Sequence, residues 1–229
     1  MLGNRLESHA LQRVGGSAIL VTPRNQGGRA PWSETSDIAI VSNRITGVAN
    51  GITILGEDEK PTERTKRLWI ANNFVEVVRA NPSGGRFLEL FHAASDVVVV
   101  HNTVLNAGTL SMGENSLVRN PTSGGFVFTD NIAQRGAYGF WGPGGEGTLP
   151  LTKLFTSWLF TRNVIVGTAG QPYPAGNHFP KDLQSVRFRD ESRGDYRLAA
   201  DSPYKGAGAD GTDIGVDVDA LERALSAER

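Results

Sequence analysis

The chain has 229 residues, 39% of them hydrophobic, which is enough for one domain with a sizeable core. Its formal net charge is −1 and it has no long run of Lys or Arg, so a nucleic-acid partner has no electrostatic support. No apolar stretch approaches the roughly 18 residues that suggest a membrane span. Cysteine is absent, which excludes disulfides and thiolate metal sites.

Residues 1–16 are predicted to be an N-terminal edge or partial cap. Residues 1–14 contain charges and no long apolar segment, so we expect no signal peptide in them. Leu2, Leu6 and Ala10 share one helical face, and a capping helix is one expectation for them. The alternative is that the chain is the C-terminal part of a longer repeat protein.

Residues 17–166 contain one phrase five times: apolar, any, apolar, any, any, Asn. The final asparagines of successive copies are 30, 29, 29 and 32 positions apart, at Asn43, Asn73, Asn102, Asn131 and Asn163. Strand-like runs recur between the phrases at 17–21, 51–55, 86–91 and 138–141, and the copy expected near 109–117 is degraded. Each unit therefore holds at least two short strands.

This repeat predicts an all-β fold, a single-stranded right-handed parallel β-helix of about five to six coils. Its segments are β-branched and aromatic, which excludes helical repeats of similar length. We expect one domain over 1–229, with coils over 17–166 and a C-terminal coil and cap over 167–229. The recurring asparagines predict a ladder, because an inward amide can donate to one coil and accept from the other.

The C-terminal stretch leaves the repeat and is predicted to be a turn-rich cap. Residues 219–228 then read as a short helix with Leu221 and Leu225 on one face. Four aspartates lie in this region, and turn or helix-cap roles are favoured over Ca²⁺ binding, because their spacing matches no EF-hand loop. They are Asp210, Asp213, Asp217 and Asp219.

The chain resembles bacterial right-handed β-helix repeat proteins of the pectate-lyase-like superfamily. The resemblance rests on residues 19–32, on the Asn phrases, and on the ending at 195–215. It implies a secreted or periplasmic protein, and a function in cleaving or binding acidic or neutral polysaccharides.

Uronate lyases of this fold carry Ca²⁺-binding carboxylates and a basic residue on an outer sheet face. The outward positions of the Asn-phrase strands contain no charge, so that site is not matched here: Ala39, Val41, Trp69, Ala71, Val98, Val100, Val127, Thr129, Leu159 and Thr161. An apolar face of this kind suggests cover by a loop, a partner subunit in a homo-oligomer, or a missing domain.

The strand-like runs between the Asn phrases carry outward residues that suit a catalytic or binding site better. If Leu88 and Leu90 point inward, Phe87, Glu89 and Phe91 point outward. The candidate catalytic residues are Glu89 and His92 as acid and base, with Arg24 neutralising a carboxylate. The candidate substrate-binding residues are Trp32, Phe91 and Trp141, whose rings would stack on a sugar. The alternative for each is a surface residue covered by loops.

Two classes of function remain open at this point. One is a polysaccharide lyase or glycoside hydrolase acting on an extracellular polysaccharide. The other is a non-catalytic glycan-binding or assembly module, or a C-terminal fragment of a larger β-helix protein.

The histidines share no metal-like spacing, so we expect no metal and no cofactor, with Ca²⁺ unsupported.

Overall fold

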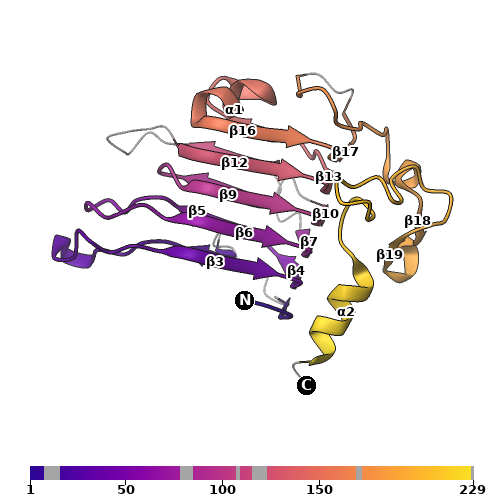
Figure 1. Cartoon of the computed structure of the whole chain (residues 1–229), viewed down its shortest axis with the longest axis horizontal. Coiled ribbons are helices and arrows are strands. Elements are labelled where there is room, and N and C mark those ends of the chain that lie inside the picture. Colours follow the sequence, from indigo (N-terminus) through magenta and orange to yellow (C-terminus); the bar gives the residue numbers. More distant parts are fainter. Residues whose placement is uncertain (8–15, 78–84, 107–108, 115–122, 169–171, 228–229) are drawn as a thin grey trace.

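A computed structural model of the chain describes residues 1–7, 16–77, 85–106, 109–114, 123–168 and 172–227. Most strands pair in parallel with the equivalent strand of the next turn, so the chain is a parallel β-solenoid with all-β architecture (Figure 1). This confirms the fold class predicted from the repeat.

Three sheets run along the solenoid. Sheet A carries the Asn phrases and contains β3 (Ser36–Val41), β6 (Lys66–Ala71), β9 (Ser95–Val100), β12 (Ser123–Thr129) and β16 (Phe155–Thr161). Sheet B contains β1 (Arg5–Glu7), β4 (Arg44–Val48), β7 (Phe74–Val77), β10 (Thr103–Leu105), β13 (Ile132–Gln134) and β17 (Val164–Val166). Sheet C contains β2 (Ser17–Val21), β5 (Asn50–Leu55), β8 (Arg86–Phe91), β11 (Thr109–Glu114), β14 (Phe140–Gly142) and the antiparallel β15 (Gly145–Glu146).

The solenoid has about four regular turns, slightly fewer than expected. Each regular turn supplies one strand to each sheet, from β2, β3 and β4 in the first to β11, β12 and β13 in the fourth. The next turn is interrupted by helix α1 (Thr148–Leu154) between β15 and β16. A strand is present at Thr109–Glu114, where the repeat is degraded, because its backbone pairs with β8.

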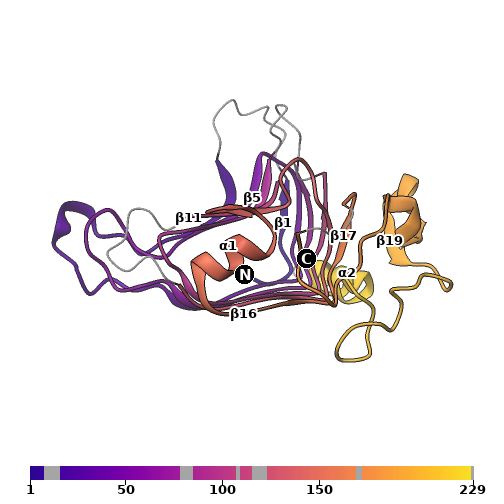
Figure 2. The same ribbon diagram turned by 90° about the horizontal axis from the view of Figure 1, so that it is seen from above.

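The core lies between the three sheets and is filled by inward residues of each turn. In its last turns it is aromatic: Phe126 stacks on Phe155 and Phe128 on Phe160, with ring centroids 4.5 and 5.1 Å apart. Figure 2 shows α1 lying across the end of this core, inside the ring of sheets. Leu151 of α1 is fully buried in the core cluster, so this helix, which the sequence did not predict, covers the apolar end.

The N-terminus is a strand and not the expected helix. Leu6 pairs in register with Ile45, which extends sheet B by one strand, β1. The expectation of a helix through Leu2 and Leu6 is therefore wrong, because pairing with β4 satisfies backbone groups that would otherwise form an open edge. Ala10 lies outside the described residues.

The C-terminal segment runs along the side of the solenoid, over the outer face of sheet B (Figure 1). It contains 3₁₀ turns at Leu183–Val186 and Glu191–Arg193, the antiparallel pair β18 (Phe188–Asp190) and β19 (Asp195–Leu198), and helix α2 (Val218–Ala227). A further 3₁₀ turn, Gln26–Gly28, follows β2. Leu221 and Leu225 of α2 are buried in one cluster with Phe74 and Leu105 of sheet B, which confirms the predicted helix and its apolar face.

The five repeat asparagines form one continuous column of hydrogen bonds, and all five are fully buried. Along the column, each Nδ2 donates to Oδ1 of the next asparagine at 2.9–3.0 Å. The column extends further in both directions, because Asn4 donates to Asn43 and Asn163 donates to Asn177. Seven side chains therefore connect the successive turns.

Candidate functional site

Glu89 is buried on β8, only 6% exposed, and both carboxylate oxygens are engaged. Oε2 accepts a hydrogen bond from the Thr53 hydroxyl at 2.5 Å, and Oε1 accepts one from Arg86 at 2.5 Å. The adjacent Phe87, expected to face outward, is also fully buried and belongs to the hydrophobic core cluster. Phe87 therefore presents no ring to solvent, because the alternation of inward and outward side chains does not decide whether the outer face of a strand is exposed.

The predicted aromatic residues of sheet C lie on different turns. Phe91 ends β8 and is half-buried. Trp141 lies on β14, which is separated from β8 by β11, and 37% of its surface is exposed. Its ring packs edge-on against Tyr138, with centroids 5.4 Å apart. Trp141 and Tyr138 therefore form a small exposed aromatic pair near the end of the solenoid.

Arg24 lies beside Asp58 and not beside Glu89. The Arg24 guanidinium lies 3.9 Å from the Asp58 carboxylate. The pKa of Asp58 is lowered, first by the hydrogen bond that the Asn25 N–H donates to it and then by the charges of Arg24 and His92. Within the described part of the chain, no hydrogen bond or ion pair joins Glu89 to His92 or Arg24.

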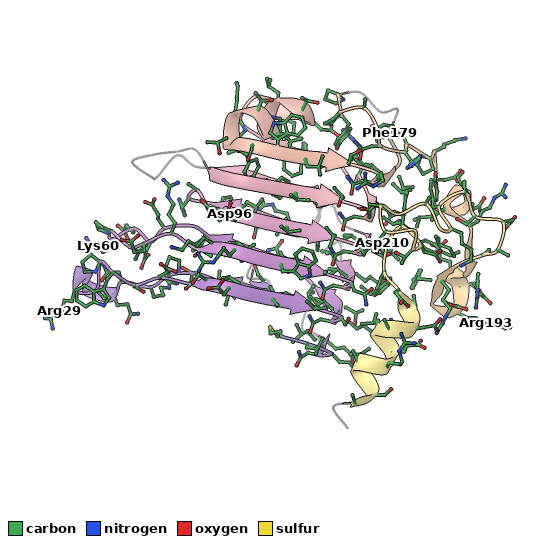
Figure 3. The ribbon with its side chains drawn as sticks, viewed as in Figure 1. Arg29, Lys60, Asp96, Phe179, Arg193 and Asp210 are labelled. Atoms are coloured by element: carbon green, nitrogen blue, oxygen red, sulfur yellow. The ribbon has the colours of Figure 1, made fainter. Side chains whose placement is uncertain are left out.

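Trp32 is 72% exposed and belongs to the loop between β2 and β3. Figure 3 places Arg29 of this loop, together with Lys60, at the end of the molecule opposite to Asp210. The residues predicted as one site thus occupy separate places: β8 carries Glu89 and Phe91, the loop after β2 carries Arg24 and Trp32, and β14 carries Trp141. Whether any of them acts in catalysis stays a prediction.

A second set of residues, outside the predicted site, forms a more continuous arrangement. Each ladder asparagine of the repeat is preceded by a residue with a left-handed backbone, with φ between 52° and 57°. This conformation is uncommon outside glycine, and it recurs at every turn because the chain bends there from sheet A into sheet B. The residues, which we call the turn column, are Ser42, Asn72, His101, Asp130 and Arg162.

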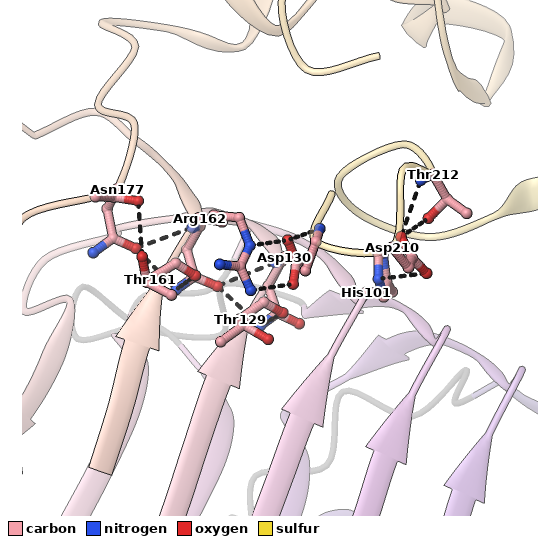
Figure 4. Close-up of polar contacts among 12 residues, drawn as sticks. His101, Thr129, Asp130, Thr161, Arg162, Asn177, Asp210 and Thr212 are labelled. Carbon is pink, nitrogen blue, oxygen red and sulfur yellow. Dashed lines mark hydrogen bonds and ion pairs between the residues drawn. The ribbon is translucent and has the colours of Figure 1, made fainter. Parts of the chain in front are cut away.

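The turn column holds residues 205–217, which we call the strap. Asn72 Oδ1 accepts from the backbone N–H of Asp217 at 2.7 Å, and Asp130 Oδ1 accepts from the N–H of Ala209 at 3.2 Å. Arg162 in turn donates to Asp130 at 3.0 Å (Figure 4). The strap is therefore fixed to the solenoid at several successive turns.

His101 contacts the strap through both ring nitrogens. Nδ1 lies 3.2 Å from the Asp213 carbonyl, which can only accept, so Nδ1 carries a proton. Nε2 lies 3.5 Å from the Asp210 carboxylate (Figure 4). The pKa of Asp210 is lowered, mainly because the Thr212 hydroxyl and N–H donate to it and further because of His101.

A groove of about 500 Å³ lies between sheet A and the strap. Its floor is apolar and comes from the outward residues Trp69, Ala71 and Val100. The opposite side carries charged and polar groups, including Asp210, Lys205 and Arg197. The three floor residues belong to the apolar face that the sequence predicted to need cover, but the groove itself was not predicted.

The cover is incomplete, and an apolar row stays open along sheet A. Five outward side chains are in register across the sheet: Ala39, Trp69, Val98, Val127 and Leu159. Trp69 and Leu159 are 47% and 48% exposed. The groove therefore opens, at Trp69, onto a row of apolar side chains.

Among the described residues, no group of three or more His, Asp or Glu side chains is arranged to hold a metal ion. The expectation of no metal and no cofactor stays a prediction. No described helix is long and apolar enough to cross a membrane.

Its stacked parallel sheets and asparagine column define the chain as a parallel β-solenoid protein. Comparison with protein-family models, with curated proteins and with solved structures finds no match in any of the three.

Proposed function

We propose that this protein is a glycan-binding β-helix, similar to bacterial proteins of the pectate-lyase-like superfamily and secreted or periplasmic like them. The observation that carries the proposal is the exposed Trp69 at the mouth of the groove between sheet A and the strap. Pyranose rings present apolar C–H surfaces that stack on an indole, and polar groups around it fix their hydroxyls.

The groove has a rigid frame, which favours binding. Its floor belongs to strands that are paired on both sides, β6 and β9. Its wall is held by the turn column, and Lys205 is fixed by an ion pair of 2.9 Å with Asp213. A ligand would meet groups that are already ordered, so little conformational entropy is lost on binding.

Catalysis at Glu89 has less support than binding at the groove. A general acid or base needs a free oxygen within reach of substrate, and both oxygens of Glu89 accept hydrogen bonds inside the protein. The same contacts suit a structural ion pair between Glu89 and Arg86.

Assembly is the second candidate function, and the apolar row favours it. A second copy packed on Trp69 and Leu159 would remove from water the apolar surface that the strap leaves open. A homo-oligomer formed this way would cover the mouth of the groove, so assembly and glycan binding would compete.

The test compares Trp69→Ala with Trp32→Ala, two substitutions of exposed tryptophans in different places. Binding to a panel of neutral and acidic polysaccharides is measured by affinity electrophoresis and calorimetry. We expect Trp69→Ala to weaken binding at least about tenfold, because an aromatic contact contributes about 1–3 kcal/mol. Trp32→Ala should keep wild-type affinity.

Retained binding in Trp69→Ala, with loss in Trp32→Ala, would move the site to the loop after β2. Sedimentation of both variants detects the assembly alternative, in which Trp69→Ala shifts the protein to a monomer.

Assays of new reducing ends and of absorbance from unsaturated uronates on the same panel should be negative. Turnover that Glu89→Ala or His92→Ala abolishes would establish the enzyme hypothesis instead.

A further inference from the structure

We infer that the groove selects neutral, hydroxyl-rich saccharides over uronic acids, an inference that rests on the proposed glycan-binding function. The starting observation is the balance of charge around the groove. Besides His101, four carboxylates and three Arg or Lys side chains line it: Asp210, Asp213, Asp217, Asp219, Arg189, Arg197 and Lys205. A ligand that brought further carboxylates would enter a site that already has an excess of them.

Two of the three basic groups are neutralised within the protein. Arg197 donates to Asp219 at 2.7 Å and to Glu222 at 2.6 Å, and it also pairs with Asp195. These contacts raise the pKa of Arg197, first through Asp219, so its charge is fixed and compensated. Lys205 pairs with Asp213. A uronate would have to displace these existing partners.

Two of the four carboxylates, in contrast, keep a free acceptor position among the described residues. Asp217 Oδ1 accepts the N–H of Ala220, and Asp219 Oδ1 accepts from Arg197. Within the described chain, Oδ2 of both aspartates receives no hydrogen bond. A carboxylate only accepts, so the groove requires donors from its ligand. Sugar hydroxyls supply such donors, and an ionised uronate group supplies none.

Among the described lining residues, Arg189 favours the opposite result most strongly. It lies on β18, and within the described residues its side chain makes no ion pair or hydrogen bond, although its charge lowers the pKa of Asp195 and of Asp219. It could pair with a single uronate carboxylate. In a polyuronate, however, neighbouring sugars would place their own carboxylates against Asp217 and Asp219 across the same groove. Repulsion on several sugars outweighs one additional ion pair at an exposed site.

The test uses matched oligosaccharides that differ only at C6: neutral glucose, galactose and mannose oligomers, and the corresponding oligomers with C6 as a carboxylate. Dissociation constants are measured by calorimetry on the full chain at low and high salt. We expect at least one neutral oligomer to bind about tenfold tighter than its carboxylated partner, with the difference shrinking in high salt. Asp219→Asn, checked for folding by circular dichroism, should narrow the difference.

Two negative results are distinguishable. If no oligomer of either series binds, the proposed glycan-binding function fails. If carboxylated oligomers bind as tightly as neutral ones, or tighter, the selectivity inference alone is overturned. Loss of that uronate binding in Arg189→Ala would then identify Arg189 as the acidic-sugar contact.

Discussion

Nδ2 of Asn73 donates to Oδ1 of Asn102 at 2.9 Å, and the backbone N–H of Asn73 donates to the same oxygen at 3.0 Å. One carbonyl oxygen of Asn102 therefore satisfies two donors of the preceding turn. Nδ2 of Asn102 in turn donates to Oδ1 of Asn131 at 3.0 Å, so the same contact links each turn to the next.

Asn102→Ala should destabilise the fold by about 3–5 kcal/mol, because it leaves several buried polar groups without partners at about 1–3 kcal/mol each. These groups are the Asn73 donors and the Ile70 carbonyl, which accepts from Asn102 at 3.0 Å. Urea unfolding followed by circular dichroism measures the loss of stability. Asn50→Ala is the control, because Asn50 lies outside the column, has no left-handed backbone, and accepts a hydrogen bond from the Arg86 N–H at 3.1 Å. Equal destabilisation of the two variants would contradict a special role for the column.

The strap should loosen in His101→Asn. Asparagine tolerates the left-handed backbone at this position but lacks the second ring nitrogen that faces Asp210. We expect hydrogen exchange over 208–217 to speed up by about tenfold or less, since a hydrogen bond from the His101 ring to the strap stabilises it by on the order of 1 kcal/mol. His178→Asn is the control, because His178 is exposed and its ring contacts only Tyr204 among the described rings. Unchanged exchange in His101→Asn would show that the strap is held without this residue.

Ionisation of Asp210 should make the stability of the fold depend on pH, in a direction that its lowered pKa defines. Its pKa is lowered in the folded state, mainly by the Thr212 hydroxyl, so the ionised form stabilises the fold. That contribution is present above the unfolded-state pKa of about 3.9 and is lost as pH falls through the lower folded-state pKa. Wild type should melt slightly above Asp210→Asn at neutral pH, and the two should converge in acid. A difference that grows as pH falls would contradict the assignment.

Glu89→Ala should reduce stability by about 1–3 kcal/mol, because Arg86 and Thr53 lose their shared acceptor. Glycan affinity should stay at the wild-type value, since Glu89 lies on sheet C and the groove on sheet A. Glu63→Ala, at an exposed glutamate, controls for loss of charge alone. Loss of affinity without loss of stability in Glu89→Ala would return the functional site to sheet C.

The repeat phrase was sufficient to predict the fold class, because a phrase with a period near 30 repeats the same inward contacts at every turn. Asn4 and Asn177 were missed, since they lie 39 residues before Asn43 and 14 after Asn163, outside that period. Helix α1 was missed for a related reason: it interrupts the repeat and has no counterpart in other turns.

The apolar floor of the candidate site could be predicted from the sequence, but the strap that covers it could not. Alternation along the strands identified Trp69, Ala71 and Val100 as outward and apolar, and therefore as surface that needs cover. The strap that covers them is rich in turns and has no periodicity, so nothing in its sequence indicates where it docks. The burial of Glu89 could not be predicted either. It depends on Thr53, which lies 36 residues away, and on Arg86, which lies three residues before it on the same strand.

Hydrogen exchange of the chain with and without a bound saccharide tests the central claim most directly. If the groove between sheet A and the strap is the binding site, protection on binding should concentrate at 68–72, 98–101 and 208–220. Protection concentrated at 86–92 and 138–142, with the strap unchanged, would contradict it.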